Sequence, residues 1–258
     1  DILANLPADL AGNFGFKGFS LKTRPSLEVN FLMFNFNGIF KSRDTREAVA
    51  LALKPDQLAR LAQGFAVPVS QFVSDGIFGY DPSIAKIESN TARALELVPA
   101  GLKTTLDLPQ GLEVFGENVV AQLKAVGIDV TSNYLSPQEL GKKIIGQASN
   151  FYFFGWRADL GDASDFLTAV AHSRVGDFGQ FNGGDYKNPE VDRLIELSQT
   201  TVNQPERLDY LREAMKIITV SDIIGIPLFS PEVLYGVSSD IQFSPRVDGY
   251  VLAQEVKM

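Results

Sequence analysis

Cysteine is absent from the 258 residues of this chain, and histidine and tryptophan occur once each, as His172 and Trp156. Without cysteine the chain cannot form a disulfide, a thiol nucleophile, an iron–sulfur cluster or a thiolate zinc site. A single histidine excludes the two-histidine zinc helix, and a catalytic triad would depend on His172 alone. The G-x-S-x-G motif of serine hydrolases is missing too. These absences argue against an enzyme and predict neither a bound metal nor a cofactor.

Long apolar runs and an excess of positive charge are also missing. No stretch of ~18 consecutive apolar residues occurs, so the sequence predicts no transmembrane helix. Lys and Arg number 23 against 31 Asp and Glu, which gives a net charge of −8. This balance excludes nucleic acid and anionic membranes as expected partners. The chain opens on Asp1 with no signal-peptide pattern, so we expect a mature or trimmed piece of a longer protein.

Strand-like and helix-like patterns alternate along the chain, which predicts an α/β fold with a mixed or parallel sheet. A capping box of Ser136 and Glu139 opens one helix. The strand at 150–156 is nearly all aromatic and is predicted to be buried on both faces. Residues 65–82 are predicted to form a long surface connection. The strands are expected at 27–36, 104–108, 128–134, 150–156, 226–229 and 233–237, and the helices at 44–53, 55–64, 91–98, 118–126 and 165–173 and after residues 136, 188 and 203.

An acidic loop follows the aromatic strand and carries Asp159, Asp162 and Asp165. Their spacing differs from that of an EF-hand calcium loop, and paired glycosidase acids normally come from separate elements. Asp162 can cap the next helix, and Asp165 can complement the positive end of its dipole. Asp159 lies too early for either role. It is therefore a candidate ligand-binding residue.

The two single-copy aromatic residues have open interpretations. Trp156 ends the aromatic strand, where it is either a core or rim residue or a platform for a ligand. His172 falls late in a short predicted helix, and a surface or helix-end role is favoured over catalysis.

Three segments together carry a resemblance to a known family. They are residues 35–58, with Phe40, Arg46-Glu47-Ala48 and Ala52-Leu53-Lys54-Pro55, the run Phe154-Gly155-Trp156-Arg157-Ala158-Asp159-Leu160-Gly161-Asp162, and residues 182–192, with Tyr186 and Asn188-Pro189-Glu190. In this order they resemble segments of the family 5 extracellular solute-binding proteins, which serve dipeptide and oligopeptide ABC importers. Ile226-Pro227-Leu228 and Tyr235 fit the closing strands of that family. Ala163 stands where the family usually has proline.

The resemblance implies the C-terminal lobe of a type II periplasmic-binding-protein-like fold, with a mixed sheet flanked by helices. Only the C-terminal half of the family's length is matched. Residues 1–26 would then be the end of lobe one or a linker, and residues 27–225 the second, ligand-binding lobe. Residues 226–258 would be closing strands that return toward lobe one. A solute would lie between two lobes that close by hinge bending.

The resemblance also implies a ligand site. Asp159 would pair with the α-ammonium of a peptide, and the backbone of Gly155 and Arg157 would bond to the peptide main chain, with Trp156 beside it. Asn182, from the third segment, is the other expected ligand-binding residue. The implied partners are a peptide or another small solute and the membrane subunits of an ABC permease. The implied state is a monomer in the periplasm or anchored outside the cell.

Three other interpretations stay open. A relative on the same scaffold could bind an oligosaccharide, although a carboxylate at Asp159 favours a ligand that carries an amine. An enzyme could use Asp159 and a second carboxylate as acid and base, but no nucleophile motif supports it. An interaction module could dock on a permease without holding a ligand.

Overall fold

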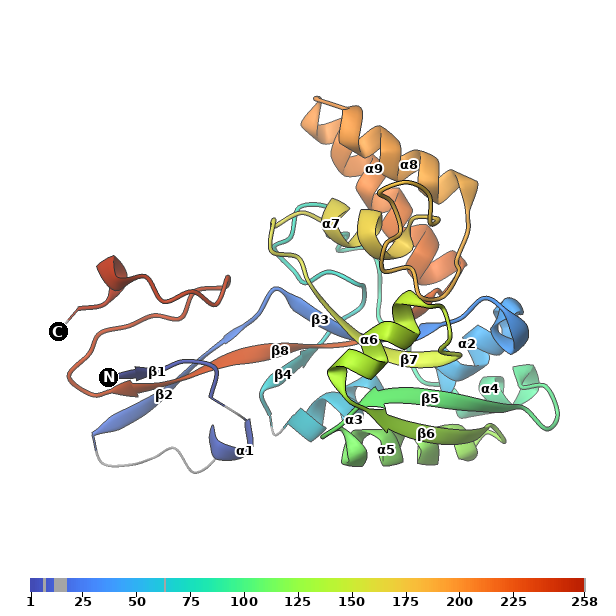
Figure 1. Ribbon diagram of the computed structural model, residues 1–258, viewed down its shortest axis with the longest axis horizontal. Helices are drawn as coiled ribbons and strands as arrows, with labels where there is room; N and C mark the ends of the chain where they lie inside the picture. Colours follow the sequence, from blue (N-terminus) through green and yellow to red (C-terminus); the bar gives the residue numbers. More distant parts are fainter. Residues whose placement is uncertain (7, 12–17, 63, 258) are drawn as a thin grey trace.

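The computed structural model describes residues 1–6, 8–11, 18–62 and 64–257 (Figure 1). Strands and helices alternate through most of this length, as predicted. The strands are β1 (Ile2–Leu3), β2 (Phe19–Pro25), β3 (Glu28–Phe34), β4 (Ala66–Pro68), β5 (Lys103–Pro109), β6 (Asp129–Leu135), β7 (Phe151–Arg157) and β8 (Gly225–Ser238). The α-helices are α1 (Ala8–Ala11), α2 (Arg43–Ala52), α3 (Pro55–Ala59), α4 (Thr91–Leu97), α5 (Glu113–Lys124), α6 (Pro137–Ile145), α7 (Ser164–Phe166), α8 (Pro189–Thr200) and α9 (Gln204–Lys216). π-Helical turns follow α7 at Leu167–Ala171 and α9 at Ile217–Ser221.

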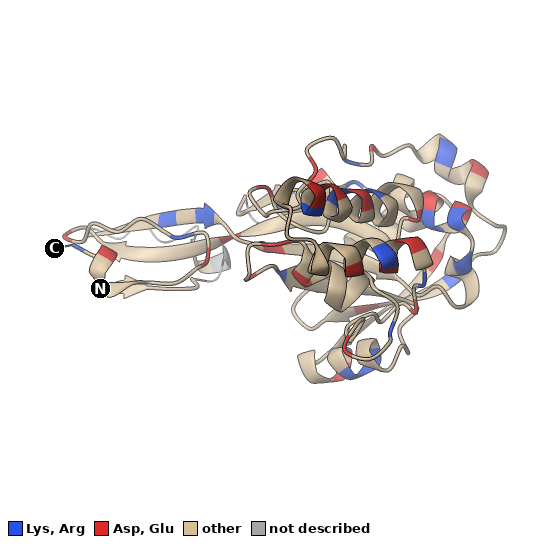
Figure 2. Cartoon of the chain, turned by 90° about the horizontal axis from the view of Figure 1, so that it is seen from above, with Lys and Arg blue, Asp and Glu red and all other residues tan. Residues whose placement is uncertain are grey.

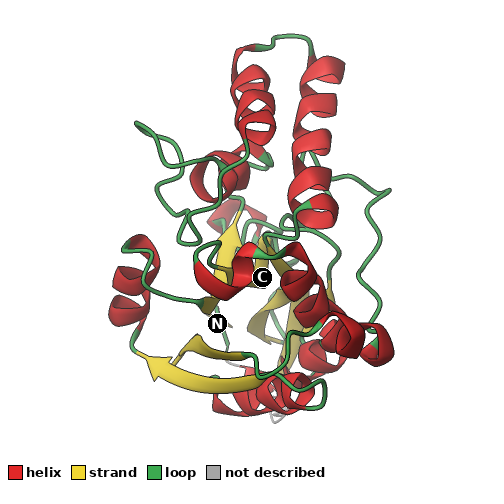
Figure 3. Cartoon of the chain, turned by 90° about the vertical axis from the view of Figure 1, so that its right-hand side faces the viewer, coloured by secondary structure: helices red, strands yellow, loops and turns green. Residues whose placement is uncertain are grey.

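These strands join in one mixed sheet in the order β1-β8-β3-β7-β5-β6, and β2 and β4 also pair with β8. β5 is parallel to both β6 and β7, whereas β3 is antiparallel to both β7 and β8. Helices cover the sheet, and α8 and α9 form a hairpin that projects from the body (Figure 3). The mixed sheet confirms the predicted α/β class.

β8 extends from the body into a projection that holds both chain termini (Figure 1). Its first residues pair with β3, and its last seven pair with β2. Between these two parts, the Ser26 N–H donates to the Pro231 carbonyl at 3.0 Å. The Ser230 hydroxyl donates to the Ser26 carbonyl, also at 3.0 Å. Hydrogen bonds therefore hold the two crossing segments together where the projection meets the body.

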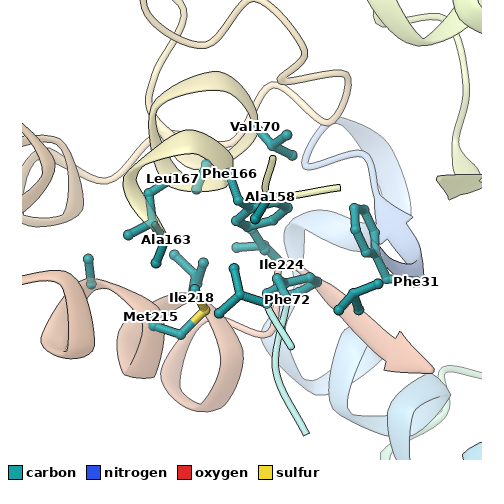
Figure 4. Packing of buried hydrophobic residues seen from close by; sticks show 14 of the residues in the cluster. Phe31, Phe72, Ala158, Ala163, Phe166, Leu167, Val170, Met215, Ile218 and Ile224 are labelled. Carbon is teal, nitrogen blue, oxygen red and sulfur yellow. The ribbon is translucent and has the colours of Figure 1, made fainter. Parts of the chain in front are cut away.

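Two apolar cores lie on opposite faces of the sheet, because successive side chains of a strand point to opposite sides. Phe31 of β3 lies in one core, packed edge-to-face on Phe72 and Phe166 (Figure 4). Phe34 of the same strand lies in the other core and stacks on Phe151 of β7 at 5.1 Å between ring centroids. In the view of Figure 2, acidic and basic residues are interleaved along the helices.

The first and third motif segments meet around a buried guanidinium. Arg46 of α2 is 5% exposed and lies 4.2 Å over the Phe36 ring. It donates to the backbone carbonyls of Asp222 and three other residues. The Asp222 carboxylate accepts hydrogen bonds from the Tyr186 hydroxyl and the Asn188 amide. These motif residues therefore fasten α2 and the start of α8 to the turn before β8.

The structure corrects three sequence predictions. Residues 65–82 are not a surface connection, because they contain β4 and place Phe72, which is fully buried, in the core. The two closing strands expected at 226–229 and 233–237 are the single strand β8, since the chain stays extended through Pro231. β7 is not buried on both faces throughout: only Phe151 and Tyr152 are buried, and the rest of the strand is half-buried. The capping box at Ser136 is confirmed.

Candidate functional site

The second half of β7 has an unpaired edge. β3 pairs with β7 along its whole length, but β5 pairs only with Phe151 and Tyr152. Beyond Tyr152, no described strand lies beside β7 on the β5 side. The second half of β7 therefore stays paired with β3 on one side, and its backbone on the other side is open to a further chain.

Hydrogen bonds at both ends of β7 identify the backbone groups that face this open side. The Asn35 N–H donates to the Asn150 carbonyl, and the Ala158 N–H donates to the Leu27 carbonyl. Residues of an antiparallel strand alternate in the direction of their N–H and C=O groups, so even-numbered residues of β7 face β3. Gly155 therefore directs both its backbone groups away from β3, and they make no hydrogen bond with a described residue.

The side chains of β7 divide between two faces at this end. Trp156 lies on one face, where its ring is 5.4 Å from Phe181 and 6.4 Å from Phe166. It is half-buried, and its indole N–H makes no well-formed hydrogen bond with a described residue. Trp156 is thus a rim aromatic at the end of a core, and both of its sequence interpretations stay open.

On the opposite face of β7, two polar side chains of β3 lie over Gly155. The β3–β7 register places Asn30 opposite Gly155 and Glu28 opposite Arg157. A methyl group on Gly155 would lie 2.6 Å from Asn30 Oδ1 and 2.8 Å from Glu28 Oε1. Glycine is therefore required here, because the two polar side chains of β3 occupy the space where a side chain would lie.

A cavity of about 490 Å³ lies next to this face, in the angle where β7 and β5 separate. Most of its lining is apolar, and its polar side chains include Glu28 and Asn30. Its position at the carboxyl ends of parallel strands is where open α/β sheets bind ligands. The lining residues are Glu28, Asn30, Leu58, Leu61, Pro109, Gln110, Gly111, Leu112, Val114, Phe115, Phe153 and Phe229.

Asp159 lies just beyond β7 and pairs with a neighbour. Its carboxylate is 2.6 Å from Arg157 Nε, and its side chain is 64% exposed. The Arg157 guanidinium also donates to the Asp248 carbonyl, in the C-terminal segment. Asp159 therefore has a partner within the chain, because Arg157 neutralises it. Its exposed carboxylate is still at the open end of β7.

The other two acids of the loop are held differently. The Asp162 carboxylate accepts hydrogen bonds from the Ser164 N–H and from Arg207 Nη1. Burial alone would raise the pKa of Asp162, but these hydrogen bonds outweigh it and lower that pKa. Burial raises the pKa of Asp165, with Trp156 opposing the shift and Asp159 and Asp162 adding to it. Asp162 lies one residue before the N-cap of α7, Ala163, and its side chain accepts from the first N–H of that helix, while Arg207 gives it a second partner.

Asn182 is buried and fully engaged inside the protein. Its side chain donates to the carbonyls of His172 and Tyr186 and accepts from the Tyr186 N–H. With 2% exposure it shapes the loop before α8. In this structure no part of its side chain is available to a ligand, and its predicted ligand contact stays untested. His172 is itself 1% exposed and stacks on Phe178, so it ends a helix but does not lie on the surface.

Glu28 and Asn30 are site candidates that sequence reasoning missed. The sequence did contain a signal: Glu28 and Asn30 place a carboxylate and an amide at the start of a strand that is otherwise apolar. The Glu28 carboxylate makes no hydrogen bond or ion pair with a described residue. Burial raises its pKa, and the charge of Arg157 opposes the shift.

We expect Glu28→Gln to stabilise the chain at neutral pH. The folded protein binds a proton at Glu28 more readily than the unfolded chain does, so the charged form weakens the folded state. The gain is present above the raised pKa and disappears as the pH falls through the ordinary value of 4.5. A gain of up to about 1 kcal/mol raises the melting temperature by roughly 2–4 °C.

Thermal melts of wild type and Glu28→Gln at pH 7.5 and pH 3.5 measure this difference. Glu117→Gln, on the exposed face of α5, is the control and is expected to change neither melt. A Glu28→Gln variant that is less stable at pH 7.5 would show that the carboxylate has a stabilising partner.

No group of three or more His, Asp or Glu side chains in the described part of the chain is placed to hold a metal ion. None of the described helices is both long and apolar enough to cross a bilayer.

Residues 1–178 match the family described as bacterial extracellular solute-binding proteins, family 5 Middle. The chain belongs to this family. Among curated family 5 relatives, the glutathione-binding protein GsiB of Salmonella typhimurium is 26% identical over 219 residues, which cover 78% of this chain and 42% of GsiB. GsiB of Pectobacterium atrosepticum is 24% identical over 211 residues, which cover 76% and 41%. The chain therefore spans less than half the length of these relatives.

Solved structures of similar proteins agree on the fold. The periplasmic binding protein DppA from Helicobacter pylori, in complex with the peptide STSA, superposes with a TM-score of 0.84 at 21% identity, covering 99% of this chain and 52% of that chain. HbpA2 from Haemophilus parasuis gives 0.85 at 16% identity, covering 97% and 52%. These neighbours confirm the type II binding-protein fold. The family 5 relatives are solute-binding proteins and not enzymes, as the sequence predicted.

Proposed function

We propose that this chain supplies one lobe of a two-lobed protein that binds peptides for an ABC importer outside the cytoplasmic membrane. The observation that carries the proposal is the unpaired edge of β7 around Gly155. An extended peptide can add to such an edge as a further strand. Hydrogen bonds between main chains do not depend on the side chains, so one edge accepts many peptide sequences.

The Asp159 carboxylate at the end of this edge fixes which end of an added peptide lies there. Asp159 lies beyond the last residue of β7, where the α-ammonium of an added peptide can replace Arg157 as its partner. The solved relative DppA holds a peptide, which supports the ligand class. We also propose residues 27–225 as the ligand-binding lobe, with residues 1–26 and 226–258 leading toward the other lobe; these two segments cross where the Ser230 hydroxyl donates to the Ser26 carbonyl.

The test of this function is calorimetry of the two-lobed protein with di- to pentapeptides. We expect Asp159→Asn to weaken peptides with a free amino terminus by roughly ten- to hundredfold, which is the value of one hydrogen bond to a charged group. This range is limited because the carboxylate is exposed and already paired with Arg157.

Two controls separate charge from structure. N-Acetylated peptides are expected to bind the wild type weakly and the variant no worse. Asp177→Asn, in an exposed loop, is expected to bind like the wild type. The chain alone is expected to bind peptides far more weakly, because the facing lobe supplies contacts and excludes water. Equal losses for free and acetylated peptides would remove Asp159 from the ligand site.

An oligosaccharide ligand is the second candidate. Trp156 and Phe181 at the rim favour it, because aromatic faces pack on apolar sugar faces. Calorimetry with maltose and cellobiose in the same format distinguishes the two classes.

A further inference from the structure

The cavity between β5 and β7 contains two polar side chains that have no partner. Asn30 is 9% exposed, and its carboxamide makes no hydrogen bond with a described residue. The Glu28 carboxylate next to it makes none either. The polar atoms of both side chains still reach solvent, so a ligand that enters the cavity can replace the hydrogen bonds that these groups otherwise make to water.

The chemistry of these groups favours a cation. Glu28 supplies negative charge, and Asn30 turns its carbonyl oxygen toward the face of Gly155 on which Glu28 lies. Both oxygens are acceptors, and an ammonium or guanidinium group has donors only. The surrounding wall is apolar and includes Phe153 and Phe229. The pocket therefore suits a chain of methylene groups that ends in a positive charge.

Arg157 does not fill this role within the protein. It lies opposite Glu28 in the β3–β7 register. Its guanidinium, however, is engaged by the Asp159 carboxylate and the Asp248 carbonyl. Two acids thus face one arginine, and the arginine is bonded to the exposed acid. The half-buried acid, Glu28, is left for another cation.

We propose that this cavity is a side-chain pocket for a basic residue, lysine or arginine, of the bound peptide, with Glu28 and Asn30 as its specificity residues. This inference rests on the proposed function and names a substrate preference within it. A peptide added to the open edge of β7 directs alternate side chains to the Gly155 face. A side chain on that face comes next to Glu28 and Asn30, whose oxygens lie over Gly155 where a residue with a side chain could not be accommodated.

The experiment compares lysine with norleucine, which has a matching methylene chain and no charge. Ala-Lys-Ala, Lys-Ala-Ala and Ala-Ala-Lys and their norleucine counterparts are titrated into the two-lobed protein by calorimetry. We expect lysine to be favoured by roughly ten- to hundredfold at one of the three positions, the value of a hydrogen bond to a charged group. Glu28→Gln is expected to abolish that preference and to leave norleucine peptides within about twofold. Glu117→Gln, on α5, is the matched control.

A second measurement tests the pocket independently of peptide binding. Hexylamine, which imitates the lysine side chain, is titrated into the chain labelled with ¹³C at its glutamate carboxyls, with hexanol as the neutral probe. We expect hexylamine, but not hexanol, to shift the Glu28 resonance. No peptide binding together with a hexylamine shift at Glu28 would overturn the proposed function and support the pocket. Equal affinity for lysine and norleucine peptides would overturn the pocket and keep the function. Failure of both probes would overturn both.

Discussion

Replacing Arg46 with methionine is expected to destabilise the chain by roughly 3–5 kcal/mol, because it leaves buried groups without their charged donor. The guanidinium donates to Asp222 O at 2.7 and 2.9 Å, to Phe40 O at 2.6 Å and to Lys41 O at 3.0 Å. It also donates to the carbonyl of Ile223, which has a positive φ of 49°. A β-branched residue adopts this backbone only when its surroundings hold it there.

Urea denaturation measures the loss as a lower midpoint at unchanged slope. Arg43→Met is the control, since Arg43 lies one turn earlier on α2 with a side chain that is 48% exposed. Exposed pairs of this kind contribute about 1 kcal/mol or less. Arg46→Lys keeps the charge but not the planar group with its several donors, so we expect an intermediate loss. Equal losses for Arg43→Met and Arg46→Met would contradict the anchoring role of Arg46.

Replacing Phe31 with alanine is expected to cost a similar 3–5 kcal/mol, the usual range for a buried phenylalanine. Phe31 is fully buried, and its ring lies 5.3 Å from Phe72, 5.6 Å from Phe166 and 5.8 Å from Phe154 between centroids. Phe154 and Phe166 in turn contact Trp156, so the cavity left by Phe31 also loosens the support of Trp156.

Fluorescence measures both the loss of stability and the change around Trp156, because Trp156 is the only tryptophan in the chain. Denaturation followed by this signal gives the stability, and its emission maximum before unfolding reports the local change. Phe31→Leu fills most of the same volume and is expected to cost about 1.5 kcal/mol or less. An alanine variant as stable as the leucine variant would show that this core repacks around the missing ring.

Local sequence signals predicted those helices whose ends are fixed by contacts within a few residues. The capping box at Ser136 and the Asn-Pro start at Asn188 each mark a helix end by side-chain chemistry in the same turn. The route of residues 65–82 was not predictable in this way. Its buried residues, such as Phe72, pack against a sheet formed by distant strands, so no regular spacing of apolar residues in the local sequence marks them as buried.

The site was only partly predictable for the same reason. Gly155 and Asp159 lie in one short segment, so a motif could indicate them together. Glu28 comes to the same place only through the register between β3 and β7. Asn182 belongs to a motif as well, but its hydrogen bonds show that this motif maintains the loop before α8. A motif therefore marks a constrained position without separating structural from ligand-binding roles.

The pairing of β2 with β8 also sets an order of events during synthesis. Ser20 and Val237, which are joined across these strands, lie 217 residues apart in the chain. At translation rates of ~5–20 residues per second, β2 waits roughly 10–40 seconds for its partner to be made. Until then its edge is open to pairing with other chains. Lys22 and Arg24 in the exposed part of β2 place charge on that edge, and charged side chains of this kind oppose the pairing of edge strands with other chains.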